Sequence, residues 1–189
     1  SGKLSDQILD QLNVSQKTIN TYCLEYAYSD IKNDEIVLSG NYPHLVMIDI
    51  ADNLGFSGGN NVGIRLALKD SKIEYFWLLN NDTLITPDSL TQLVNKSQQF
   101  SNTALLSSYI TTIESEEKVW FEGGIYDPWT ATSRHVTTEK FASHKYQYLS
   151  GCSLFISRIV LRTIGLLDES IFLYAEDIDY SVKAKNKQI

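Results

Sequence analysis

The spacing of apolar residues predicts alternating strands and helices over the first half of the chain. Aromatic and aliphatic side chains occupy every second position from Thr21 to Tyr28, which predicts a strand, and an apolar run from Leu45 to Ile50 predicts a second strand. Helical spacing follows in 60–69 and 86–100, on either side of a strand ending before Asn80, and 104–110 predicts one more strand. Shorter runs predict a helix near 4–12 and a strand at 36–38. This order predicts an α/β fold with a mostly parallel central sheet flanked by helices.

The pattern changes after Thr111. Short stretches at 119–121, 123–126 and 131–137 predict a small antiparallel portion, and the apolar stretch 146–156 predicts a further strand. A short helix is expected over 158–164, closed by Gly165, and a last helix is expected to open at 175–179. No internal repeat, low-complexity tract or linker divides the sequence, so we expect one domain over residues 1–189.

The charge balance and the cysteine usage narrow the function classes. The net charge of −7 argues against sequence-independent binding of nucleic acid, because neutralising phosphates requires Lys and Arg. Cys23 and Cys152 form neither a disulfide framework nor a zinc motif, which favours free thiols in a reducing cytosol. No apolar run has the length of a membrane span, and no signal peptide opens the chain. We therefore expect a cytoplasmic protein.

Three polar residues, Asn80, Asn81 and Asp82, follow the buried strand that begins at Tyr75. Ligands of open α/β sheets bind at the carboxyl ends of strands, and Mg²⁺ is held by one or two carboxylates together with substrate phosphates. Asp82 is therefore a candidate ligand for Mg²⁺ or Mn²⁺ on a phosphate-bearing molecule. The alternative interpretation is an ordinary turn, in which Asn-Asp pairs are common. A second loop-like segment, 53–61, is rich in glycine and asparagine and precedes a helix, which predicts either close backbone approach to a ligand or a tight strand-to-helix turn.

The acidic segment Glu176-Asp177-Ile178-Asp179 opens the last predicted helix. Carboxylates at this position are favoured by the helix dipole alone, which is one interpretation. The other is catalytic, because a carboxylate in a partly desolvated cleft can take a proton from a hydroxyl nucleophile.

Taken in order, these segments resemble the inverting family 2 glycosyltransferases, in particular bacterial rhamnosyltransferase-like members. The resemblance rests on Asn53-Leu-Gly-Phe-Ser-Gly-Gly-Asn-Asn-Val-Gly63, on Asn80-Asn-Asp-Thr83 as a variant of the Asp-x-Asp motif, on Ser150-Gly-Cys152, and on Phe172-Leu-Tyr-Ala-Glu-Asp-Ile-Asp179. It covers the chain from about Ile36 onward. It implies the GT-A (Rossmann-like) fold and transfer of a sugar with inversion, in the synthesis of bacterial surface polysaccharide.

The resemblance also implies a role for each motif residue. Asp82 would bind a divalent metal, Mg²⁺ or Mn²⁺, and Asp177 would be the catalytic base, with Glu176 beside it. Gly151 and Cys152 would form the floor beneath donor sugar and acceptor. The donor pocket would be shaped by Asn53, Gly58, Gly59, Asn60, Asn80 and Asn81. The donor implied is a UDP- or dTDP-sugar, with a deoxysugar such as rhamnose as one candidate. The acceptor implied is a glycan or a lipid-linked molecule. Such an acceptor makes the inner face of the membrane a second expected location besides the cytosol.

The chain also departs from the family pattern. The two early motifs that bind the base and ribose, Pro-Thr-Tyr-Asn-like and Asp-Asn-Gly-Ser-x-Asp, are absent, and the sequence stops before the histidine that often completes the metal site, so we expect a chain truncated at both ends. Two alternatives stay open: a non-catalytic GT-A-like binding module or inactive fragment, and a nucleotidyltransferase. Strand edges exposed by truncation would favour a homo-oligomer.

Overall fold

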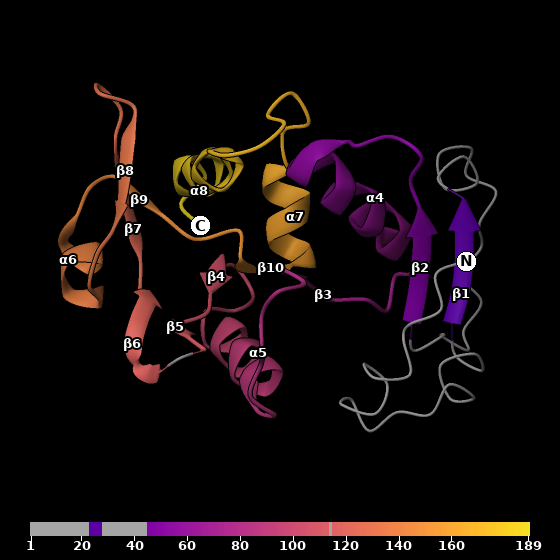
Figure 1. Ribbon diagram of the computed structural model, residues 1–189, viewed down its shortest axis with the longest axis horizontal. Helices are drawn as coiled ribbons and strands as arrows, with labels where there is room; N and C mark the ends of the chain where they lie inside the picture. Colours follow the sequence, from indigo (N-terminus) through magenta and orange to yellow (C-terminus); the bar gives the residue numbers. More distant parts are fainter. Residues whose placement is uncertain (1–22, 28–44, 114) are drawn as a thin grey trace.

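A computed structural model describes residues 23–27, 45–113 and 115–189, which form a mixed α/β structure (Figure 1). The strands are β1 (Cys23–Ala27), β2 (Leu45–Asp49), β3 (Tyr75–Leu79), β4 (Leu106–Ser107), β5 (Ile110–Thr112), β6 (Ser115–Phe121), β7 (Gly124–Asp127), β8 (Thr132–His135), β9 (Gln147–Tyr148) and β10 (Ser153–Ser157). The helices are α4 (Gly55–Leu68), α5 (Ser89–Gln99), α6 (Thr138–Ser143), α7 (Arg158–Ile164) and α8 (Glu176–Asn186). The helix predicted near 4–12 and the strand predicted at 36–38 lie outside the described residues.

Strand pairing is divided among four small sheets in the described part of the chain. β1 and β2 are parallel, whereas β10 lies between β3 and β4 and is antiparallel to both. β3 and β4 therefore run in the same direction without being neighbours. The described strands show parallel pairing at β1–β2 and antiparallel pairing elsewhere, so a mostly parallel central sheet is not shown. The alternation of strands and helices suggested it, but the alternation carries no information about a later strand that inserts between two earlier ones.

The main core lies where β3 and β10 meet three helices. β10 is buried along its whole length, and its Leu154 and Ile156 pack with Leu78 of β3 and Tyr180 of α8. The opposite side of α4 packs Val62 and Leu66 against β2, so α4 lies between the sheet of β1 and β2 and the sheet of β3, β10 and β4 (Figure 1). Burial of these side chains fixes the ends of β3 and β10, and with them the polar residues that follow. No helix among the described residues is long and apolar enough to cross a membrane.

Several predicted elements are confirmed, with shifted boundaries. The strands near 23–27, 45–49 and 75–79, the short antiparallel strands after 111, the helix 158–164 with Gly165 beyond it, and the last helix are all present. The stretches 104–110 and 146–156 each divide into two strands, the second because Ser150-Gly-Cys152 forms a turn.

Two helices begin at different residues from those predicted. α4 begins at Gly55, five residues before Asn60, so the glycine-rich segment is mostly helical rather than a loop. α5 begins at Ser89 after an Asp88 cap, because the Thr86 hydroxyl bonds Asp88 and Ser89 in a turn that precedes the helix.

The helix α6 was not predicted, and a distant residue stabilises its start. The Oε2 atom of Glu122, before β7, accepts hydrogen bonds from the backbone N–H and the hydroxyl of Thr138, at 2.7 and 3.0 Å. A carboxylate from another element thus caps the first turn, a contact that no local pattern reveals.

Candidate functional site

The turn Ser150-Gly151-Cys152 joins two of the acidic motifs. On one side, the carbonyl of Cys152 accepts a hydrogen bond from the backbone N–H of Asn80 at 3.0 Å, at the tip of β3. On the other side, the N–H of Gly151 donates to Oδ2 of Asp177 at 3.1 Å. The turn therefore connects the segment that carries Asp82 to the start of α8.

The start of α4 closes the arrangement from a third side. The N–H of Phe56 donates to the carbonyl of Phe172 at 2.9 Å, and Gly55 adopts φ +70°, where a Cβ atom would lie 2.2 Å from that same carbonyl oxygen. The ring of Phe56 faces Gly151, whose Cβ position would be 3.1 Å from Cζ of the ring. Only glycine fits at position 55, because a side chain would meet backbone atoms in a left-handed conformation. All four sequence motifs thus meet around one turn.

Asp177 is held in a fixed orientation by backbone donors. Its Oδ2 accepts from Gly151 N–H, and its Oδ1 accepts from Ile178 N–H at 2.8 Å. Burial raises the pKa of this carboxyl, while the hydrogen bonds and the nearby His135 oppose that rise. A carboxylate that is desolvated but ionisable, with its orientation fixed, is suited to accept a proton from a hydroxyl group.

Glu176 differs from its neighbour. Its side chain is buried, its Oε2 atom has no hydrogen-bond partner in the described structure, and burial, together with the charge of Asp177, raises the pKa of its carboxyl. The two residues before it, Tyr174 and Ala175, both adopt the left-handed conformation, with φ of 66° and 69°. Such conformations cost about 1–3 kcal/mol each, and the surrounding contacts must hold them. This backbone turns the chain sharply before α8 and directs Glu176 inward.

The tip of β3 opens onto a cavity of about 560 Å³. Asp82, Asn80 and Cys152 line it together with Ile110 and Trp120. Burial is the main cause that raises the pKa of the Cys152 thiol, and the negative charge of Asp82, which lines the same cavity, adds to it. Asn81 is exposed and is not among the lining residues.

The donor atoms around this cavity suit a hard cation that arrives with its ligand. The described residues contain no group of three or more His, Cys, Asp or Glu side chains that could enclose a metal. One carboxylate, with amide and hydroxyl oxygens of Asn80 and Thr83 beside it, matches the way Mg²⁺ is shared between a protein carboxylate and substrate phosphates. A metal at Asp82 would therefore bind with a diphosphate.

Five of the six residues expected to shape the donor pocket, Asn81 among them, lie outside the lining of this cavity. Oδ1 of Asn53 accepts from Gly55 N–H at 3.0 Å, and the side chain of Asn60 donates to the Phe56 carbonyl one turn earlier in α4 at 2.9 Å. Gly58 is buried against Leu54, and the space beside Gly59 is open. In this structure the polar side chains of the segment stabilise the start of α4.

Sequence reasoning missed residues that the fold brings to the site. His135 lies at the end of the exposed strand β8, its ring packs edge-on against Trp120 with the ring centroids 4.8 Å apart, and its charge opposes the rise in the pKa of Asp177. Trp120 lines the cavity, so this pair links the cavity to Asp177. Asn61 is fully buried and bonds the backbone of Leu167 through both side-chain atoms and Glu169 through its amide. An asparagine within an apolar helix face was the available signal for Asn61, whereas nothing local distinguished His135.

Comparison with known proteins gives the family. Residues 28–165, which include the first three motifs, match the sequence profile described as glycosyl transferase family 2. The chain is 31% identical over 145 residues to "Low-salt glycan biosynthesis hexosyltransferase Agl10" of Haloferax volcanii, a match that covers 75% of this chain and 47% of that protein. The chain thus spans about half the length of this curated relative. With the profile matching most of the chain and the motifs meeting in the structure, the chain belongs to glycosyl transferase family 2.

Proposed function

We propose that this chain transfers a sugar from a nucleotide-sugar donor to a hydroxyl acceptor with inversion. Its fold would be GT-A, with a mostly parallel sheet in which β1, β2 and β3 would be the first strands. One observation carries the proposal. The turn at Gly151 and Cys152 bonds Asp177 on one side and the tip of β3, next to Asp82, on the other. The carboxylate that would act as base and the carboxylate that would face the phosphates thereby lie on either side of one short segment.

The proposed reaction is a single displacement at the anomeric carbon. Asp177, oriented by Gly151 and Ile178, takes the proton of the acceptor hydroxyl while that oxygen forms the new glycosidic bond. The bond between the anomeric carbon and the diphosphate oxygen breaks on the opposite face, and the nucleoside diphosphate leaves. A divalent metal bound through Asp82 would neutralise the charge of the leaving diphosphate. Asn80 would contact the donor from the lining of the same cavity.

The remaining assignments have weaker structural support and stay predictions. Gly151 and Cys152 would form the floor beneath the donor sugar, since Cys152 lines the cavity. Glu176 would assist from the buried start of α8. Asn81 would contact the donor from the tip of β3, and Asn53, Gly58, Gly59 and Asn60 would do so from the start of α4.

The related hexosyltransferase is described as acting in glycan biosynthesis. We infer that this chain uses a UDP- or dTDP-linked hexose or deoxyhexose, rhamnose included, and acts in the synthesis of a cell-surface glycan. Its acceptor would be a glycan or a lipid-linked glycan, presented in the cytoplasm or at the inner face of the membrane.

Calorimetric titration with UDP and dTDP, with and without Mn²⁺, tests the proposal. We expect binding that requires the metal and is lost in Asp82→Ala, whereas Asp177→Asn still binds because that side chain contacts the acceptor. Glu139→Ala, which removes an exposed carboxylate from α6, is the matched control and keeps wild-type affinity. Metal-independent binding, or unchanged binding in Asp82→Ala, would contradict the role of Asp82, and a wild-type chain that binds neither nucleotide would contradict the donor site itself.

A further inference from the structure

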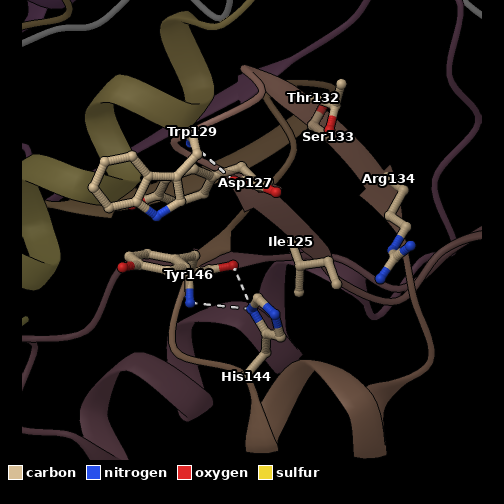
Figure 2. Close-up of a pocket in the computed structure, with 9 residues that line it drawn as sticks. Ile125, Asp127, Trp129, Thr132, Ser133, Arg134, His144 and Tyr146 are labelled. Carbon is tan, nitrogen blue, oxygen red and sulfur yellow. Dashed lines mark hydrogen bonds between the residues drawn. The ribbon is translucent and has the colours of Figure 1, made fainter.

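A second cavity, of about 340 Å³, lies at the hairpin formed by β7 and β8. Its walls carry three aromatic side chains, Tyr126, Trp129 and Tyr146, together with His144, Asp127 and Arg134. Figure 2 shows Trp129 and Tyr146 at one end of the cavity and Arg134 at the other. The ring centroids of Tyr126 and Tyr146 are 5.4 Å apart and their planes are tilted by 54°, so they form a continuous aromatic surface. The volume is in the range of small-molecule sites.

The turn of the hairpin holds Trp129 outward. Its side chain is 89% exposed, although its backbone is fixed: Oδ1 of Asp127 accepts from the N–H of Trp129 at 2.8 Å and from the N–H of Thr130 at 3.4 Å. Ala131 completes the turn with φ 53°. An indole that packs into no core gives up the stabilisation that its burial would provide. A rigid turn that presents it beside other rings is therefore a feature suited to binding a ligand, because little conformational entropy is lost on contact.

The aromatic cavity and the cavity at Asp82 have no lining residue in common. Both faces of the hairpin contribute to the aromatic cavity, since the paired residues Ile125 and Arg134 line it and so do Tyr126 and Ser133, the next pair. His135 and Asp177 do not line it. A ligand in the aromatic cavity is therefore held by side chains other than those of the proposed reaction site.

The lining selects the chemistry of the ligand. Aromatic faces carry partial negative charge and pack against the C–H groups of a pyranose ring, while the hydroxyls of Thr132 and Ser133 with Arg134 and Asp127 can bond the ring's own hydroxyls. The charges of Arg134 and Asp127 are opposite and cancel, and the chain as a whole has a net charge of −7, which disfavours nucleic acid and acidic polymers. The geometry points to a second glycan-binding site in this cavity, which takes the pyranose units of a neutral oligosaccharide by stacking them on Trp129 and Tyr146. The site does not depend on the proposed transfer reaction.

Titration of the full chain with neutral trisaccharides tests this site. The probes are trisaccharides of glucose, galactose or mannose in α and β linkages. Their binding is measured by calorimetry and by saturation-transfer NMR. We expect at least one to bind, Trp129→Ala to weaken that binding about tenfold, as loss of one aromatic contact predicts, and Trp129→Phe to keep most of it. Asp127→Ala, which removes the acceptor that fixes the backbone of Trp129, should weaken binding although no aromatic side chain is removed.

Two controls separate this site from the donor site and from general effects. Phe100→Ala removes an exposed ring beyond the end of α5, outside the cavity, and should leave trisaccharide binding unchanged. Asp82→Ala should also leave it unchanged, so loss of nucleotide binding together with intact trisaccharide binding in that variant would show that the two sites are separate. Because Trp129 is exposed, the Trp129→Ala variant should melt at the wild-type temperature. The inference is overturned if no trisaccharide binds the wild-type chain, or if the folded Trp129→Ala variant binds as tightly as wild type.

Discussion

Replacing Asp177 by Asn separates the proposed catalytic role of this residue from its structural role. The substitution keeps the size of the side chain and one acceptor oxygen, but it removes the group that would take the acceptor's proton. General base catalysis contributes about 10²–10⁴-fold to rate, so we expect kcat to fall by about that factor. Binding of the nucleotide with Mn²⁺ should be retained, because Asp177 bonds Gly151 and Ile178 rather than the cavity at Asp82.

The Asp177→Asn substitution should change the stability of the fold much less than it changes kcat. The raised pKa of Asp177 means that the fold favours the neutral acid, so replacing the carboxylate by a neutral amide relieves a desolvation penalty. Asn offers one acceptor fewer to the two backbone N–H groups, which costs about 1 kcal/mol. These two effects oppose each other, so we expect only a small net change in the free energy of unfolding near pH 8. Unfolding therefore cannot account for a loss of activity of a hundredfold.

The pH dependence provides a second test of the same reasoning. A carboxyl whose pKa is raised on folding binds its proton more tightly in the folded state. Its contribution to stability is therefore lost as pH rises from its usual value of 3.8 through the raised value. Asn cannot titrate, so the stability of Asp177→Asn relative to wild type should increase between pH 4 and pH 8.

The assay measures nucleoside-diphosphate release with the donor that supports turnover by the wild-type chain, and thermal unfolding is followed at pH 4 and pH 8. Asp168→Asn is the matched control, since it changes an exposed carboxylate that pairs with Lys183 beside the same helix. Retention of more than a tenth of wild-type kcat in Asp177→Asn would refute the role as base. A fall in the stability of Asp177→Asn relative to wild type between pH 4 and pH 8 would refute the account of a desolvated carboxyl.

Three further predictions concern the residues around this site. Gly55→Ala should lower the free energy of unfolding by about 2 kcal/mol or more, seen in urea titration, because the new Cβ meets the carbonyl of Phe172 at φ +70°; an unchanged midpoint would show that the contact is not present. His135→Gln should move the acidic limb of the kcat/KM profile to higher pH, because the positive charge that lowers the pKa of Asp177 is removed; a shift to lower pH would contradict this electrostatic contact. Asn61→Ala should destabilise by about 2–4 kcal/mol in the same titration, since buried backbone groups of the 167–169 segment lose their partners, and a loss below about 0.5 kcal/mol would mean that water replaces the amide.

Local patterns were sufficient for features that depend on neighbouring residues in the chain. The buried strand before Asn80, the helix that Gly165 ends and the acidic start of α8 follow from hydrophobic spacing and from residues with special backbone preferences. The motif order also identified the family, which the profile match over 28–165 confirms. The roles of the individual site residues remain predictions.

Tertiary structure alone decided how these features meet. β10 pairs with β3 and β4, and only that pairing brings the turn at Gly151 and Cys152 between Asn80 and Asp177. The proximity of His135 to Asp177 arises in the same way, through the register of β7 and β8. The amino-acid sequence by itself determined most of the strands and helices, α6 excepted, and the acidic residues at the start of α8. Which of those ends face one another depends on long-range pairing and burial, and these interactions leave no periodic signal along the chain.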